Sequence, residues 1–169
     1  MRKENGFTMI ELLIVIAIMS VMSAIAIPNI RAWGPNYRLR TAIQEAYSDF
    51  QNARVTAMRE GVNCAITFDQ PVDGTTYDYV VFVDADNDME YDAGERVIVK
   101  KEWDDYADVD EDSVTFTNND DGLPSIAFRA NGISRDNIGG FGAGTLTLSN
   151  VNGRTGSVVI AAGGTVRIN

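Results

Sequence analysis

The sequence predicts an α+β protein in which one long N-terminal helix is followed by short antiparallel strands. An almost uncharged apolar run covers residues 7–27, and residues 36–60 then place apolar side chains at helical spacing. From residue 62 onward, apolar residues alternate with polar ones, and glycine, asparagine and aspartate separate the alternating stretches. The spacing of apolar residues changes once along the chain, from the period of a helix to the period of two residues typical of strands. This change indicates one helix followed by a sheet.

The apolar run has the length of a membrane-spanning helix. At about 1.5 Å per residue, a helix over residues 7–27 would be roughly 31 Å long, close to the thickness of a bilayer core. The polar leader at residues 1–6 contains Arg2 and Lys3, and these basic residues favour a cytoplasmic N-terminus. We therefore expect residues 7–28 to cross a membrane and residues 29–169 to form a domain on the far side.

Glu11 is the only charged residue in this run. A carboxylate in a membrane helix costs on the order of a few kcal/mol at the bilayer centre and less near the interface, so it usually has a partner. The amine at the mature N-terminus of a neighbouring subunit would be a suitable partner. The alternative is a glutamate that stays hydrated at the membrane surface.

Two proline signals follow the run. Pro28 is expected to kink or interrupt the helix where the membrane ends, and Gly34-Pro35 is a second breaking signal. Between residues 36 and 60, steps of three and four residues place one apolar stripe on a single helical face, which should pack on a sheet. The stripe consists of Leu39, Ile43, Ala46, Phe50, Ala53 and Ala57. Gly61 is the expected C-cap.

Strands are predicted in the β-rich region, residues 62–169, where Val, Ile, Tyr, Phe and Thr dominate short segments. The predicted strands are Cys64–Phe68, Tyr77–Val83, Arg96–Trp103, Ser113–Thr117, Ser125–Arg129, Thr145–Ser149, Ser157–Ala161 and Thr165–Ile168. Residues 131–144 contain five glycines and few large side chains, which predicts a flexible loop. Cys64 is the only cysteine, and its apolar neighbours favour a buried structural thiol.

The junction between the leader and the apolar run resembles the processing signature of type IV prepilins. The resemblance rests on the run Gly6-Phe7-Thr8-Met9-Ile10-Glu11-Leu12-Leu13. It implies that a prepilin peptidase cuts between Gly6 and Phe7 and methylates the new Phe7 amine. It also implies that Glu11 pairs with that amine during assembly.

The body of the chain is similar to minor pseudopilins of the GspH/FimT type. The matching stretches are Leu39–Ala42, Phe50–Arg54, Ala57–Arg59, Val81–Asp86, Gly94–Glu95 and Gly163–Ile168. The resemblance implies the pilin fold, in which a helix packs as a spine on two β-sheets. It also implies a filament subunit that starts in the bacterial inner membrane with a periplasmic C-terminal domain and then joins other pilins or pseudopilins. Type IV pili and type II secretion filaments both use such subunits, and we lean slightly towards a pilus.

An acidic stretch over residues 84–95 has the ligand spacing of a calcium loop. Carboxylates occupy positions 1, 3, 5, 9 and 12 of a twelve-residue frame, as in an EF-hand. These positions hold Asp84, Asp86, Asp88, Asp92 and Glu95. Met89 stands where an EF-hand has glycine, and the flanks are predicted strands rather than helices. The two interpretations are a calcium-binding hairpin loop and a solvated turn in which Asp and Asn cap their own backbone.

Two other acidic segments lack ligand spacing. Residues 104–112 carry six acidic residues without a regular pattern and are expected to form a solvated loop. Residues 120–122, Asp-Asp-Gly, predict a turn.

The amino-acid composition argues against two classes of function, nucleic-acid binding and catalysis. The net charge is −10, which disfavours general binding to nucleic acid because phosphates would be repelled. The chain has no histidine, which removes His-dependent triads and the commonest general base, so an enzyme is not expected.

A DNA-binding minor pilin is the alternative within the same family. Some FimT-type proteins bind DNA through a C-terminal Gly-Arg-x-Arg element, and the matching positions here are Gly164 to Arg167, where the first arginine is missing. Arg154 and Arg167, with Arg129 and Arg135, would have to supply the basic patch.

Overall fold

The computed structural model describes residues 7–169, except for the side chains of residues 25–32 within the long helix. The leader, including Gly6, therefore lies outside the described residues. The chain divides into two compact units, Met1–Gly34 and Pro35–Asn169, which are described separately below.

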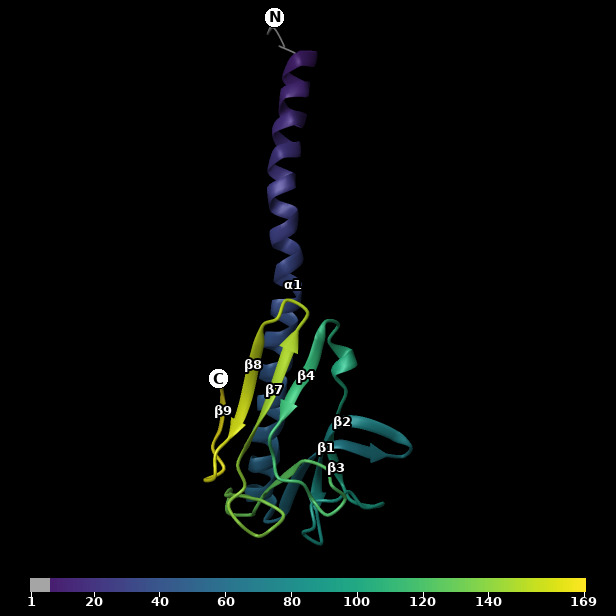
Figure 1. Ribbon diagram of the computed structural model, residues 1–169, viewed down its shortest axis with the longest axis vertical. Coiled ribbons are helices and arrows are strands. Elements are labelled where there is room, and N and C mark those ends of the chain that lie inside the picture. Colours follow the sequence, from purple (N-terminus) through teal and green to yellow (C-terminus); the bar gives the residue numbers. More distant parts are fainter. Residues whose placement is uncertain (1–6) are drawn as a thin grey trace, which may run out of the picture. The chain divides into compact units, whose positions relative to one another are not determined.

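Helix α1 runs from Met9 to Glu60 (Figure 1). The interruptions expected at Pro28 and at Gly34-Pro35 are wrong, because the helix assignment continues through both. Proline lacks an N–H and crowds the preceding turn, but its neighbours can re-form the helix beyond it. The kink at Pro28 stays a prediction, since that side chain lies outside the described part.

The apolar stripe on the second half of α1 is confirmed. All six predicted stripe residues are buried, and Ala46, Phe50, Ala53 and Ala57 are completely so. The helix ends as predicted at Gly61, which has a φ of 71°. The N–H groups of Gly61 and Val62 both donate to the Ala57 carbonyl oxygen at 3.0 and 3.2 Å. The first is the 5→1 bond of an αL cap and the second is the 6→1 bond of a Schellman motif.

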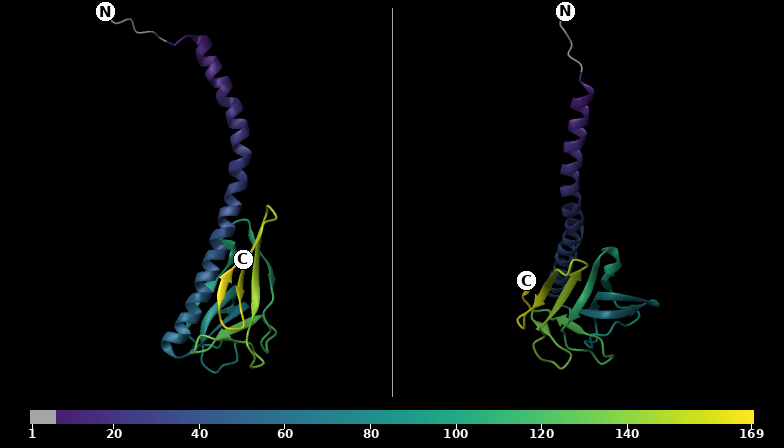
Figure 2. Two further views of the ribbon diagram at one scale, coloured as in Figure 1. Left: turned by 90° about the vertical axis from the view of Figure 1, so that its left-hand side faces the viewer. Right: turned by 45° about the horizontal axis from the view of Figure 1, so that its top comes forward.

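The strands form two antiparallel sheets, as the α+β prediction requires (Figures 1 and 2). The first sheet has the order β3-β2-β1-β5-β6 and consists of β1 (Asn63–Val72), β2 (Thr75–Asp84), β3 (Val97–Lys101), β5 (Ser125–Phe128) and β6 (Ser134–Arg135). The second has the order β4-β7-β8-β9 and consists of β4 (Val109–Val114), β7 (Gly144–Asn150), β8 (Thr155–Ile160) and β9 (Val166–Ile168). A short 3₁₀ helix, η1 (Trp103–Asp105), connects β3 to β4.

The main core lies between α1 and the sheets. Phe50 of the helix packs edge-on against Tyr79 and Phe68, with ring centroids 5.6 and 6.3 Å away. Phe68 also stacks on Phe116 at 5.4 Å. The Tyr79 hydroxyl donates to Asp49 Oδ2 at 2.7 Å, so the polar end of this buried ring is satisfied.

A smaller core covers the opposite face of the first sheet. Its buried residues are Ala65, Val72, Val80, Phe82, Met89 and Ala127. Because successive side chains of a strand point to opposite faces, β1 and β2 contribute to both cores. Met89 and the partly buried Tyr91 come from the acidic stretch, which therefore folds over this face of the sheet.

Three predictions about the β-rich region need correction. The predicted strand Ser113–Thr117 is displaced, since β4 covers Val109–Val114. The acidic segment 104–112 is consequently not all loop, because its last residues pair with β7. Ladder pairing outweighs the polar composition there, since the exposed side of an edge strand tolerates charged side chains.

The segment 131–144 is the third correction. It contains β6, whose Ser134 and Arg135 pair with Phe128 and Ala127. The Ser134 hydroxyl lies within hydrogen-bond distance of the Gly142 and Ala161 carbonyl oxygens, at 2.6 and 3.0 Å. Polar contacts hold this segment in place. Its sequence therefore lacks the alternation of apolar residues from which a strand is predicted.

Candidate functional site

The start of α1 forms a capping box. Thr8 precedes the first helical residue, and its Oγ1 accepts the Glu11 N–H at 3.3 Å. Glu11 Oε2 in turn accepts the Thr8 N–H at 2.8 Å and the Thr8 hydroxyl at 2.7 Å. Two free N–H groups at the helix start are thereby satisfied.

This contact assigns Thr8 a role that sequence reasoning missed. The signal was present, since threonine followed three residues later by glutamate is the capping-box pattern. The box holds the Glu11 carboxylate beside the chain end that cleavage would create at Phe7. Phe7 itself is 87% exposed, and Gly6 lies outside the described residues.

The first turns of α1 expose apolar side chains on all sides. These exposed residues are Phe7, Met9, Ile10, Leu12, Leu13, Ile14, Val15, Ile16, Ile18, Met19, Val21 and Met22. A helix that is apolar all round is normally covered by other helices or by lipid. Among the residues that the structure describes, no helix combines the length and the apolar character needed to cross a membrane. The assignment of residues 7–28 as a membrane span stays a prediction, and its last part, 25–28, has no described side chains.

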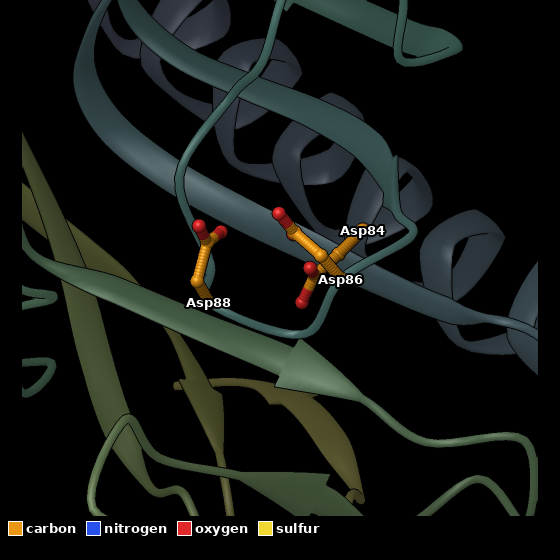
Figure 3. Close-up of side chains that lie close together, drawn as sticks. All are labelled: Asp84, Asp86 and Asp88. Carbon is orange, nitrogen blue, oxygen red and sulfur yellow. The ribbon is translucent and has the colours of Figure 1, made fainter.

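The acidic stretch joins β2 to β3 and brings three of its five predicted ligands together. One carboxylate oxygen from each of Asp84, Asp86 and Asp88 lies within 4.8 Å of the other two. Figure 3 shows these side chains gathered at the beginning of the loop. The flanking elements are strands, as predicted.

Asp92 and Glu95 lie outside this group. Glu95 accepts the Ala85 N–H through Oε1 at 2.8 Å and the Asp92 N–H through Oε2 at 3.1 Å. The glutamate thus ties the two ends of the loop together through backbone amides. The Asp92 side chain is exposed.

Asp84 is the buried member of the group. Its exposed fraction is 2%, and Oδ1 accepts the Asn87 N–H at 2.8 Å. Oδ2 is buried and has no hydrogen-bond partner among the described residues. Burial, opposed by the Asn87 hydrogen bond, raises the pKa of Asp84 to about 6.

Met89 anchors the loop. Its φ of 64° is the left-handed conformation that glycine would supply in an EF-hand. The Met89 carbonyl oxygen accepts the Thr67 hydroxyl at 2.8 Å and the Asn119 amide at 3.0 Å. Its side chain is fully buried in the smaller core, so methionine fixes the loop by packing while its backbone makes the tight turn.

The arginines considered for DNA binding lie in or next to different strands. Arg129 donates to the Gly139 carbonyl oxygen at 3.3 Å, and Arg135 donates to that of Asn87. Arg167 pairs with Val159 of β8, and Arg154 immediately precedes that strand, five residues before Val159, which corresponds to roughly 17 Å of extended chain. A DNA-binding role for Arg154 and Arg167 stays a prediction.

Cys64 is a buried thiol on β1, as predicted. Burial raises its pKa to about 11. A thiol that stays protonated is a poor nucleophile, so no reactive role follows from its position.

Comparisons with known proteins match nearly the whole chain to two family models. The model described as "Type II transport protein GspH" matches residues 42–164, and that described as "Prokaryotic N-terminal methylation motif" matches residues 1–27. Two curated proteins from Pseudomonas aeruginosa, each described as "Fimbrial protein", are 38% identical over 66 residues. The match covers 39% of this chain and 37% of each relative's length. No solved structure matches the chain.

Proposed function

Because the chain belongs to the GspH family and carries the prokaryotic N-terminal methylation motif, we propose that it is a minor pilin that assembles into a type IV pilus. Members of this family are structural pilins and pseudopilins rather than enzymes. The observation that carries the proposal is the first part of α1. Its apolar side chains are exposed on every face, and the helix begins with the Thr8–Glu11 capping box.

The proposed assembly step follows from that arrangement. Before assembly, the subunit is anchored in the inner membrane with its C-terminal domain in the periplasm. Prepilin peptidase removes residues 1–6, and the Glu11 carboxylate pairs with the Phe7 amine of the adjacent subunit. The apolar helices then leave the lipid and pack against one another in the filament core. The same contact repeats from subunit to subunit and never closes, which gives a filament rather than a ring.

We choose the pilus because of the partial similarity to two fimbrial proteins. The family description names type II transport, so a secretion pseudopilin is the second candidate. Both need the same leader, glutamate and helix. A deletion strain separates them, because each system has its own readout.

The test deletes the gene and scores surface pili by electron microscopy and secreted proteins in the culture supernatant. We expect lost or sparse pili with a normal supernatant. Normal pili with proteins trapped in the periplasm would instead assign the subunit to secretion.

Complementation with Glu11→Gln tests the assembly step in the same strain. Loss of the charge should leave the subunit in the membrane fraction while reducing its amount in sheared filaments by about tenfold, equivalent to a coupling of about 1.4 kcal/mol. Wild-type complementation is the control. Equal incorporation of the two forms would contradict the proposed pairing.

A further inference from the structure

We propose that Asp84, Asp86 and Asp88 bind one calcium ion at the start of the β2–β3 loop. This site goes beyond filament assembly and does not depend on it. It also differs from the ligand set that the sequence spacing predicts, because Asp92 and Glu95 are not part of it.

The distances between the carboxylates suit a shared cation. Calcium takes oxygen ligands at about 2.3–2.6 Å, so two oxygens on one ion can be at most about 5 Å apart. The three carboxylate oxygens lie within 4.8 Å of one another. Three negative charges at this spacing repel one another, and a divalent cation between them would turn that repulsion into attraction.

Asp84 supplies the observation that points to a ligand. Its Oδ2 is buried without a hydrogen-bond partner among the described residues, and leaving a buried carboxylate oxygen unsatisfied is costly. Arg135 is the nearby cation; its Nη2 donates to the Asn87 carbonyl oxygen, and its Nε is buried without a hydrogen-bond partner among the described residues. Within the described part of the chain no ion pair joins Asp84 to Arg135, so the Asp84 oxygen stays available to another cation.

A hollow lies on one side of Asp84, although Asp86 and Asp88 do not line it. The hollow, of about 360 Å³, is lined by Asp84, Ala85 and Asn87 of the loop and by residues 61–63 at the end of the helix. Asp86 is exposed and Asp88 is partly exposed, so water can complete the six to eight ligands that calcium takes.

The surrounding contacts hold the loop in place before any ion arrives. Met89 is packed in the smaller core and its carbonyl oxygen is bonded from two sides. Glu95 closes the other end of the loop through backbone amides. An irregular oxygen site of this kind suits calcium better than magnesium, which demands near-ideal octahedral geometry and retains its water.

The test measures thermal unfolding of the full chain in detergent after chelation, with CaCl₂ or MgCl₂ added back. Calcium at about a hundredfold above Kd should raise Tm by roughly 5–10 °C, and magnesium at the same concentration should raise it much less. Calorimetric titration with CaCl₂ should give one site per chain.

Three variants identify the ligands. Asp86→Asn changes an exposed side chain with no hydrogen bond recorded in the structure, so it should fold normally and bind calcium about tenfold more weakly. Asp84→Asn should abolish the calcium shift and raise the Tm of the calcium-free form, because it removes a buried charge. Asp92→Asn is the matched control, with the same charge change in the same loop, and should keep the shift.

The proposal fails if calcium produces no shift, or if magnesium produces an equal one, which would indicate general charge screening. It also fails if Asp92→Asn weakens binding as much as Asp86→Asn does. The absence of a calcium-specific shift would favour the solvated turn, whereas equal weakening by the two variants would favour the ligand set predicted from the sequence spacing.

Discussion

At the scale of single residues, Glu111 makes the stability of the domain depend on pH. Burial on β4, together with the negative charges of Asp69 and Asp78, raises the pKa of Glu111 to about 7, above its ordinary value of 4.5. The folded state therefore holds this proton more tightly than the unfolded state does. Its contribution to stability is complete below pH 4.5 and is lost as the pH rises through 7.

Glu111→Gln should remove this loss. Between pH 4.5 and pH 8, the free energy of unfolding of the wild type should fall by about 1–2 kcal/mol more than that of the variant. Urea unfolding at the two pH values measures the difference. Asp110→Asn, at an exposed neighbour, should leave the pH dependence unchanged, and equal slopes for wild type and Glu111→Gln would contradict the assignment.

The burial of single residues could be predicted from sequence only where the spacing or the neighbouring residues formed a full pattern. The stripe from Leu39 to Ala57 and the buried Cys64 followed from spacing and apolar neighbours. Met89 counted against a tight turn, because a non-glycine residue at positive φ is uncommon. The structure resolves this through Met89's burial, which depends on contacts with β1 and with Asn119 that are distant in sequence.

At the scale of elements, the C-terminal turn shows why two adjacent glycines are not equivalent. Gly164 has a φ of 81°, and a Cβ there would lie 2.2 Å from the Gly132 carbonyl oxygen. That oxygen accepts a hydrogen bond from Arg54 of α1 at 2.9 Å. The turn before β9 therefore packs directly on the backbone at Gly132, which Arg54 of α1 holds by a hydrogen bond. A Cβ at Gly163 would meet nothing within 4 Å.

Gly164→Ala should lower the free energy of unfolding by about 2–3 kcal/mol, through backbone strain and the clash with Gly132. Gly163→Ala, one residue away, should change it by less than about 0.5 kcal/mol. Chemical denaturation of both variants gives the comparison. A similar loss at the two positions would mean that the turn tolerates the clash by moving.

Most strands could be predicted because β1 and β2, buried on both faces, form nearly continuous apolar runs, whereas β7 alternates with one buried face. β6 could not, since it has only two residues and its serine is held by hydrogen bonds. β4 was displaced because acidic side chains dominate it, and its pairing with β7 is decided by a partner some 35 residues away. Long-range pairing of polar strands leaves no local signal.

At the scale of the whole molecule, the capping box sits in a unit separate from the folded core. All residues of both cores lie between Leu39 and Val166, whereas Thr8 and Glu11 belong to the unit Met1–Gly34. Changes at the capping box should therefore alter assembly without altering the stability of the C-terminal unit.

Thr8→Val tests this separation. It removes the hydroxyl that bonds Glu11, which costs the helix start about 0.5–2 kcal/mol, and should reduce the subunit's share in sheared filaments relative to the membrane fraction. Thr8→Ser keeps the hydroxyl and should behave as the wild type. The thermal unfolding of the core should be the same in all three forms. Equal filament shares for the valine and serine variants would show that the capping box does not matter for assembly.

The single buried cysteine has a consequence for how the protein matures. With one thiol on β1 and none to pair with it, no disulfide can form within the chain. The domain must reach its native state through packing and hydrogen bonds alone, without an oxidase or an isomerase. Its folding is thereby independent of disulfide formation, and reducing agents should leave the folded subunit intact.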